Sequence, residues 1–267
     1  VSAETGTRTS DGTAAVFGDY DNDGHLDLFV ARRGADVLLQ NLGDGTFQDV
    51  SGAAGLRDDR PSFGPLFLDA DHDGDLDLFL PGPGPNRLHR NNGDGSFLEI
   101  AGAMGLRGED GNHREAAFGD FDGDAGLDLL VAQADAGVAH YRNLLEGRFE
   151  DVKVATGLGQ GPGVDVLAIG DYNNDGFLDL FMAGNGAPRL FMNQGDGSFE
   201  ADERPTAMLE ALGGLAVEKA TLLDFDNDGW LDLLAVGDPG NGTRGVLLFR
   251  NAAPGQFDDM SALFPEN

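Results

Sequence analysis

The chain has 267 residues, with 47 Asp or Glu against 17 Lys or Arg, and a formal net charge of −30. This charge argues against binding to nucleic acids or anionic membrane surfaces, because both need a basic face. The absence of cysteine excludes disulfides, thiolate catalysis and Cys-ligated metal sites. No apolar run approaches the roughly 18 residues of a membrane helix, so we expect no transmembrane segment.

Five nine-residue acidic segments divide the chain into similar repeats. They begin at positions 50 to 53 residues apart, which are Asp19, Asp69, Asp120, Asp171 and Asp224. Repetition at a period of about 50 residues is typical of propellers and related arrays. We therefore expect one domain built from repeats at approximately 1–50, 51–100, 101–152, 153–202 and 203–267.

Within the first repeat, short strand-like runs lie at 14–18, 26–31, 36–40 and 46–50. A second recurring segment joins the last two runs and reads NLGDGTF at 41–47, NNGDGSF at 91–97 and NQGDGSF at 193–199, with looser copies at 143–149 and 251–257. Asp-Gly between apolar runs is a strong hairpin signal. Four antiparallel strands per repeat predict an all-β fold, a β-propeller of five blades, with a solenoid of shorter repeats as the alternative.

Two further features concern packing. A Pro at 205 and a Gly pair at 213–214 predict a short helix over 205–212, inserted before the last repeat. Apolar residues that recur with the blade are expected in the core. They are Phe17, Phe67, Phe118, Leu26, Leu76 and Leu127.

The acidic segments carry the ligands of a hard divalent cation. In each, carboxylate or amide side chains stand at positions 1, 3, 5 and 9 around a Gly-containing turn. They converge if the backbone curls, and the main-chain carbonyl of position 7 adds another oxygen. If position 9 binds through both oxygens, six or more oxygen ligands suit Ca²⁺ better than Mg²⁺. A polar turn is the alternative, but it needs no such cluster of mutually repelling carboxylates.

We therefore predict about five calcium sites, one per repeat. The predicted ligands are Asp19, Asp21, Asp23, His25 and Asp27; Asp69, Asp71, Asp73, Asp75 and Asp77; Asp120, Asp122, Asp124, Gly126 and Asp128; Asp171, Asn173, Asp175, Phe177 and Asp179; and Asp224, Asp226, Asp228, Trp230 and Asp232. The fourth site has one charge less because of Asn173. The third has Ala125 where the others have Gly, and Ala is costly if that position needs a positive φ.

These motifs carry a family resemblance. The run FGDYDNDG at 17–24, followed by LD at 26–27 and NLGDGTFQDV at 41–50, resembles the FG-GAP/VCBS repeats of integrin α-subunit propellers. It is closer still to bacterial and cartilage-acidic-protein-like VCBS proteins. The resemblance covers all five repeats and implies calcium between strands 1 and 2, in mostly extracellular proteins. Such propellers commonly have seven or eight blades. Because VSA at 1–3 matches VSG at 50–52, we expect either a five-bladed propeller or a segment of a larger one.

Antiparallel order places the acidic segments and hairpins on one side of each blade and the variable connections on the other. Variable loops on a rigid scaffold usually carry binding sites. We therefore predict a calcium-stabilised binding, adhesion or scaffold module that recognises a protein or glycan partner. The alternative is a secreted polysaccharide lyase or hydrolase, for which His113 and Arg114, expected in a variable loop, are the residues to test. No catalytic motif is present, so we expect no enzyme.

Calcium also suggests a compartment. Sites of this kind fill at extracellular calcium concentrations, so we expect an extracellular or periplasmic protein. The chain begins with Val1 rather than Met. We therefore expect a processed or excised segment whose signal peptide has been removed.

Overall fold

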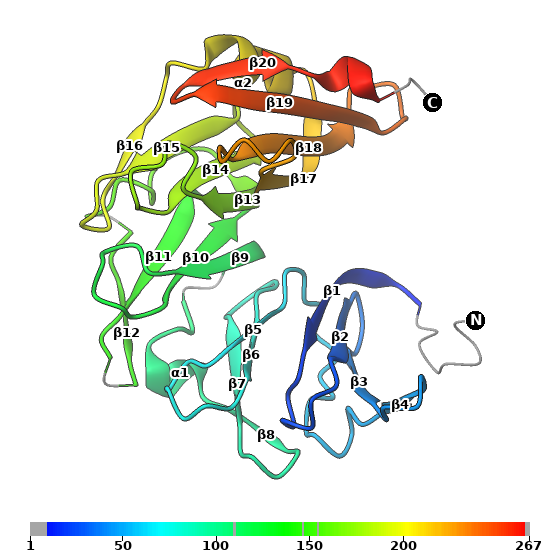
Figure 1. Cartoon of the computed structure of the whole chain (residues 1–267). Helices are drawn as coiled ribbons and strands as arrows, with labels where there is room; N and C mark the ends of the chain where they lie inside the picture. Colours follow the sequence, from blue (N-terminus) through cyan, green and yellow to red (C-terminus); the bar gives the residue numbers. More distant parts are fainter. Residues whose placement is uncertain (1–9, 109–110, 146, 154, 265–267) are drawn as a thin grey trace. The chain divides into compact units, whose positions relative to one another are not determined.

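The computed structural model describes residues 10–108, 111–145, 147–153 and 155–264. They form five sheets, each of four antiparallel strands in sequence order, which we number as blades 1 to 5 (Figure 1). Blades 1 and 2 comprise β1 (Gly12–Gly18), β2 (Asp27–Arg32), β3 (Val37–Asn41), β4 (Phe47–Asp49), β5 (Leu66–Leu68), β6 (Asp77–Leu80), β7 (Arg87–Asn91) and β8 (Phe97–Glu99). Blade 3 comprises β9 (His113–Gly119), β10 (Asp128–Gln133), β11 (Val138–Asn143) and β12 (Phe149–Asp151). Blades 4 and 5 comprise β13 (Val164–Gly170), β14 (Asp179–Gly184), β15 (Arg189–Asn193), β16 (Phe199–Ala201), β17 (Ala216–Leu223), β18 (Asp232–Asp238), β19 (Gly245–Ala253) and β20 (Gln256–Asp259).

The predicted all-β fold of five four-stranded blades is confirmed. In the first repeat the strand bounds differ from the expected ones by at most two residues. The helix expected over 205–212 is α2 (Thr206–Gly213), with Pro205 as its N-cap residue. The sequence did not predict the two shorter elements, α1 (Ala101–Met104) and η1 (Ser261–Leu263). No helix among the described residues is long and apolar enough to cross a membrane. The VSA match at 1–3 lies outside the described residues.

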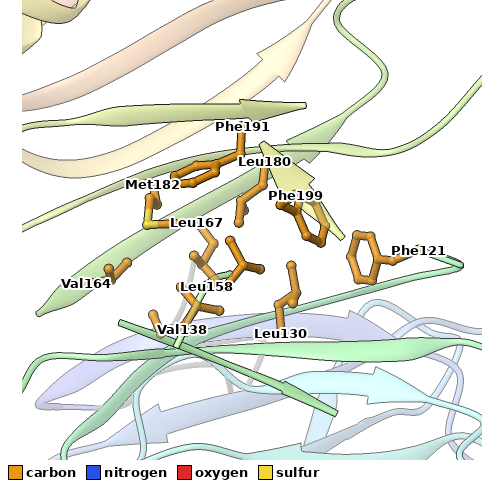
Figure 2. Packing of buried hydrophobic residues seen from close by; sticks show 11 residues of the cluster. Phe121, Leu130, Val138, Leu158, Val164, Leu167, Leu180, Met182, Phe191 and Phe199 are labelled. Atoms are coloured by element: carbon orange, nitrogen blue, oxygen red, sulfur yellow. The ribbon is translucent and has the colours of Figure 1, made fainter. Parts of the chain in front are cut away.

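The chain divides into two compact units, Val1–Ala116 with Tyr141–Asp151, and Ala117–His140 with Val152–Asn267. In the first unit, apolar side chains of blades 1 and 2 form one core, which includes Tyr20, Phe29 and Phe97. In the second unit, two cores lie between successive sheets. One joins blades 3 and 4 and contains Phe121, Leu180 and Phe199 (Figure 2). The other joins blades 4 and 5 and includes Met208 and Leu212 of α2.

Glycine at the end of a first strand allows the next blade to approach closely. A Cβ on Gly18 would lie 2.6 Å from the ring of Phe67 in blade 2. A Cβ on Gly170 would lie 2.6 Å from Leu231 in blade 5. The aromatic or aliphatic residue of one blade therefore packs where the preceding blade has no side chain, and larger residues at these glycines would force the backbones apart.

The expected core residues are only partly buried, and for several of them the prediction is wrong. Phe67 is 8% exposed, whereas its counterparts Phe17 and Phe118 are 58% and 37% exposed, and Leu26 is 58% exposed. Leu76 and Leu127 are half-buried. Periodicity indicates the face on which a side chain lies but not what covers that face. Phe67 packs on the preceding blade, and no described blade precedes blade 1 in the chain.

Candidate metal centres

The segments between the first and second strands form five acidic loops, numbered 1 to 5 after their blades, with positions 1 to 9 at 19–27, 69–77, 120–128, 171–179 and 224–232. The position-1 carboxylate closes each loop. In loop 1, Asp19 Oδ1 accepts the N–H of Asp23 at 3.0 Å and Oδ2 accepts that of Gly24 at 2.9 Å. Loops 2, 4 and 5 repeat both bonds, and in loop 3 Asp120 accepts from Gly123 and Ala125. The repeated Asp thus imposes the curl that the sequence predicted.

Two positions in each loop have left-handed backbone. At position 6, Gly24 has φ 87° and Ala125 has φ 70°, so the positive φ expected to make Ala125 costly is present. At position 4, Asn22 has φ 58° and His72 has φ 60°. Sequence reasoning missed this second position. The signal was available, because position 4 is Asn in three loops and Gly in loop 3, and both residues tolerate this conformation.

The position-9 carboxylate is fully buried in all five loops. In loop 1, Asp27 Oδ2 accepts the N–H of Tyr20 at 3.1 Å and Oδ1 accepts that of Asn41 at 2.8 Å. Loops 2 and 5 contain the same pair of bonds, to Asp77 and Asp232. Each oxygen retains a second lone pair that can bind an ion. In these loops position 9 therefore joins the loop to the hairpin that follows the third strand of the same blade, as well as serving as a predicted ligand.

Burial makes these carboxylates hard to ionise without a cation nearby. Burial, together with the charges of Asp21 and Asp23, raises the pKa of Asp27 to about 6 despite its two amide donors. Burial likewise raises the pKa of Asp77 and of Asp179 to about 7. A divalent ion would reverse this balance, because an opposite charge at short range favours the ionised form.

Several carboxylates converge closely enough to share one ion. Ligand oxygens of each group lie within 4.8 Å of one another, and the groups are Asp19, Asp21 and Asp27; Asp69, Asp71 and Asp73; Asp120, Asp122 and Asp128; and Asp224, Asp226 and Asp232. Position 5 of loops 1, 3 and 5, and position 9 of loop 2, lie outside these groups. Loop 4, with Asn173, forms no such carboxylate group among the described residues.

The position-3 carboxylates of loops 1 and 2 fit a bound cation in a further respect. Asp21 Oδ1 and Asp71 Oδ1 are buried and accept no hydrogen bond within the described part of the chain. A cavity of about 560 Å³ opens beside Asp21 and is bounded by Gln40 and by residues 93–96 of the next hairpin. A buried carboxylate oxygen without a donor is costly, and a metal ion would remove that cost. The residues present therefore fit Ca²⁺.

Loop 5 already contains a positive side chain. The Arg250 guanidinium donates to Asp226 through Nε and to Asp228 through Nη2. In loop 1 the corresponding residue of β3 is neutral Gln40, which donates to Asp21 at 2.6 Å. Sequence reasoning missed both contacts, because they join residues about 20 positions apart across neighbouring strands.

The opposite side of the blades differs from the expectation in two places. His113 and Arg114 begin β9 rather than lying in a loop, and His113 is fully buried with Nδ1 3.1 Å from the carbonyl of Gly84. The chain leaves the loop earlier than expected because residue 112 pairs with residue 83. Arg87 is also buried, and its guanidinium donates to Asp58 at 3.2 Å. These arginine and histidine side chains are thus part of the scaffold.

Blades 4 and 5 have two adjoining cavities on this side. One, of about 330 Å³, is lined by the β14–β15 loop, by Gly213 and Gly214 at the C-terminal end of α2, and by the β18–β19 loop. The other, of about 690 Å³, combines apolar side chains with polar ones, and its lining includes Leu215, Val246, Phe264, Asn241, Thr243 and Arg244. A mixed apolar and polar lining on variable loops is typical of a ligand site.

Comparison with known proteins shows the relationship of the repeats. The FG-GAP-like repeat family matches four overlapping stretches, 19–80, 69–131, 120–182 and 171–235. No curated protein is significantly similar in sequence. The fold is similar to that of an Agrocybe aegerita lectin, with 21% identity and a TM-score of 0.54, over 94% of this chain and 65% of the lectin. It is also similar to the V. cholerae biofilm matrix protein Bap1, with 15% identity and a TM-score of 0.56, over 91% of this chain and 38% of Bap1. The chain thus spans less than two thirds of either protein.

Proposed function

Because the chain belongs to the FG-GAP-like repeat family, we propose that it is a calcium-stabilised module for binding or scaffolding. The observation that carries this proposal is the convergence of carboxylates in loops 1, 2, 3 and 5, with buried oxygens of Asp21 and Asp71 left without donors. In this proposal each ion neutralises a loop whose carboxylates would otherwise repel one another, and it thereby fixes the connection between the first two strands of a blade.

Recognition is assigned to the side opposite the acidic loops. The cavities beside α2 support this assignment, because they combine apolar side chains such as Leu215 and Phe264 with polar groups from a long β18–β19 loop. We propose a glycan or a protein as the partner. The similar lectin is described as recognising non-reducing terminal N-acetylglucosamine, and Bap1 is a biofilm matrix protein. For this chain a sugar is the first class to test, since rings with apolar faces and hydroxyls suit such a lining.

The module is proposed to act without catalysis and outside the cytoplasm. The one histidine considered for catalysis, His113, is buried against the Gly84 carbonyl and unavailable to a substrate. Oxygen-only loops of this kind would fill where calcium is abundant, which favours an extracellular or periplasmic location.

Four measurements test the proposal. Calorimetric titration with Ca²⁺ should give saturable heat, and excess chelator should lower the thermal midpoint, because an ion that binds only the folded state stabilises it by about 2.7 kcal/mol per site at 100 times its Kd. Unchanged melting in chelator would reject the calcium role. A glycan array and an assay for turnover of acidic polysaccharides address the partner, and reproducible turnover would reject the non-enzymatic reading.

A further inference from the structure

In blades 2, 4 and 5, the asparagine that begins the hairpin also contacts the acidic loop of the preceding blade. Asn91 Nδ2 donates to the carbonyl of Tyr20 in loop 1, at 2.7 Å. Asn193 Nδ2 donates to Phe121 in loop 3 at 2.9 Å, and Asn251 Nδ2 to Tyr172 in loop 4 at 2.6 Å. The acceptor is always the carbonyl of position 2, which belongs to the peptide joining position 2 to the predicted ligand at position 3.

The same asparagines hold the acidic loop of their own blade. The main-chain N–H of Asn91 donates to Asp77 Oδ1 at 2.8 Å. Those of Asn193 and Asn251 donate to Asp179 at 2.9 Å and Asp232 at 2.7 Å. One residue therefore bonds to the position-9 carboxylate of its own loop and to the backbone beside the position-3 ligand of the neighbouring loop.

In two blade pairs the bonds form an unbroken path between carboxylates. The N–H of Tyr20 donates to Asp27, its carbonyl accepts from Asn91, and the N–H of Asn91 donates to Asp77. Phe121 and Asn193 connect Asp128 with Asp179 in the same way. Asp27, Asp77, Asp128 and Asp179 are fully buried and the two asparagines nearly so. Because water does not separate these groups, a displacement or polarisation at one end is transmitted to the other.

We propose that these asparagines are positioning residues that couple ion binding in adjacent blades. The inference rests on the proposed calcium sites. An ion in one loop draws its position-3 and position-9 ligands inward and fixes the peptide between positions 2 and 3. The asparagine then holds the position-9 carboxylate of the next loop in its binding geometry, so less ordering remains when the second ion binds. The coupling is reciprocal, because each ion changes the affinity for the other by the same factor.

The pair formed by loops 4 and 5, which Asn251 joins through its bonds to Tyr172 and Asp232, offers a site-specific readout. Trp230, the single tryptophan of the chain, occupies position 7 of loop 5. We therefore expect it to sensitise the luminescence of Tb³⁺ bound in that loop. Loop 4 is weakened by Asp175→Asn, which removes a charge but keeps the acceptor for the N–H of Phe177. We expect Asp175→Asn to raise the Tb³⁺ midpoint at Trp230 about five-fold, the lower end of typical coupling strengths. In an Asn251→Ala background the same substitution should leave that midpoint unchanged.

Two further variants make the test decisive. Asn241→Ala removes an amide in the same blade that accepts from Thr243 and, within the described part of the chain, has no hydrogen bond to an acidic loop, so it should preserve the five-fold effect. Asn251→Asp keeps the backbone bond to Asp232 but removes the side-chain donor to the Tyr172 carbonyl. This variant takes the place of Asn251→Ala if the alanine variant does not fold. A shift that persists without the Asn251 donor, or that is absent in the parent chain, overturns the coupling. Absence of both Tb³⁺ luminescence and Ca²⁺ heat would instead reject the calcium sites themselves.

Discussion

The side-chain amide of Asn91 lies 2.7 Å from the main-chain carbonyl of Tyr20, 71 residues earlier in the chain. This bond crosses from one blade to the next, whereas Asn41 makes only the contacts within its own blade among the described residues. A comparison of Asn91 with Asn41 therefore distinguishes the bonds that this asparagine makes within its own blade from the bond that it makes to the preceding blade.

Replacing these two asparagines should therefore have unequal effects. Asn91→Ala removes a buried donor from the Tyr20 carbonyl, which should cost about 1–3 kcal/mol beyond the loss of local bonds. Asn41→Ala removes the local bonds alone and should cost less. Urea unfolding in saturating Ca²⁺ measures both, and equal losses for the two variants would contradict the assignment.

Gly18 should not accept a side chain. In Gly18→Ala the new Cβ would meet the Phe67 ring at 2.6 Å, and we expect a loss of about 1–3 kcal/mol from overpacking. Gly34→Ala is the matched control, because a Cβ there has no neighbour within 4 Å. Thermal melts of the two variants should differ clearly, and similar melts would show that blade 2 shifts without cost.

Replacement of Ala125 by glycine should increase the stability of the protein. Its φ of 70° is unfavourable for a side chain, so Ala125→Gly should stabilise the protein by about 1 kcal/mol and tighten ion binding in loop 3. The reverse change in loop 1, Gly24→Ala, should destabilise, since its φ is 87°. Urea unfolding with Ca²⁺ and with chelator resolves the two contributions. A destabilised glycine variant would mean that chain flexibility outweighs backbone strain.

Asp77 should contribute to folding stability even when calcium is removed. Asp77→Ala leaves the amides of Ala70 and Asn91 buried without acceptors, at a cost of at least about 2 kcal/mol in chelator. Asp73→Ala removes an exposed predicted ligand whose side chain accepts the N–H of Asp75, and it should lower stability mainly in the presence of Ca²⁺. If both variants lose stability only when Ca²⁺ is present, Asp77 does not stabilise the fold independently of the ion.

Arg250 should compete with the ion in loop 5. Arg250→Gln removes the guanidinium from Asp226 and Asp228 and introduces the residue found at this position in blade 1. Removal of one nearby positive charge should make the free energy of ion binding more favourable by about 1 kcal/mol at high dielectric. The Tb³⁺ midpoint measured at Trp230 should therefore fall roughly five-fold. Weaker binding in the variant would show instead that the guanidinium holds the ligands in place.

The repeat pattern predicted the strands, hairpins and acidic loops because each depends on residues close in sequence. It could not predict that His113 is buried or that Phe17 is exposed, since both depend on what lies across a sheet face. The bonds of Asn193 and Asn251 join positions more than 70 residues apart. A signal for them existed, because Asn begins all five hairpins and the Asp-Gly turn alone does not require it.

The glycine at the end of a first strand and the Asn of the hairpin have a consequence for how such chains grow. A junction needs a recess and a carbonyl from one repeat, and a bulky side chain and an amide from its successor, as Gly170 and Tyr172 meet Leu231 and Asn251. Every unit that carries both halves can follow any other. Blade 4 carries both halves, because Leu178 and Asn193 meet blade 3 as Leu231 and Asn251 meet blade 4. Its duplication would therefore leave every new joint matched, whereas Leu68 and Leu223 stand in place of the glycine in blades 2 and 5.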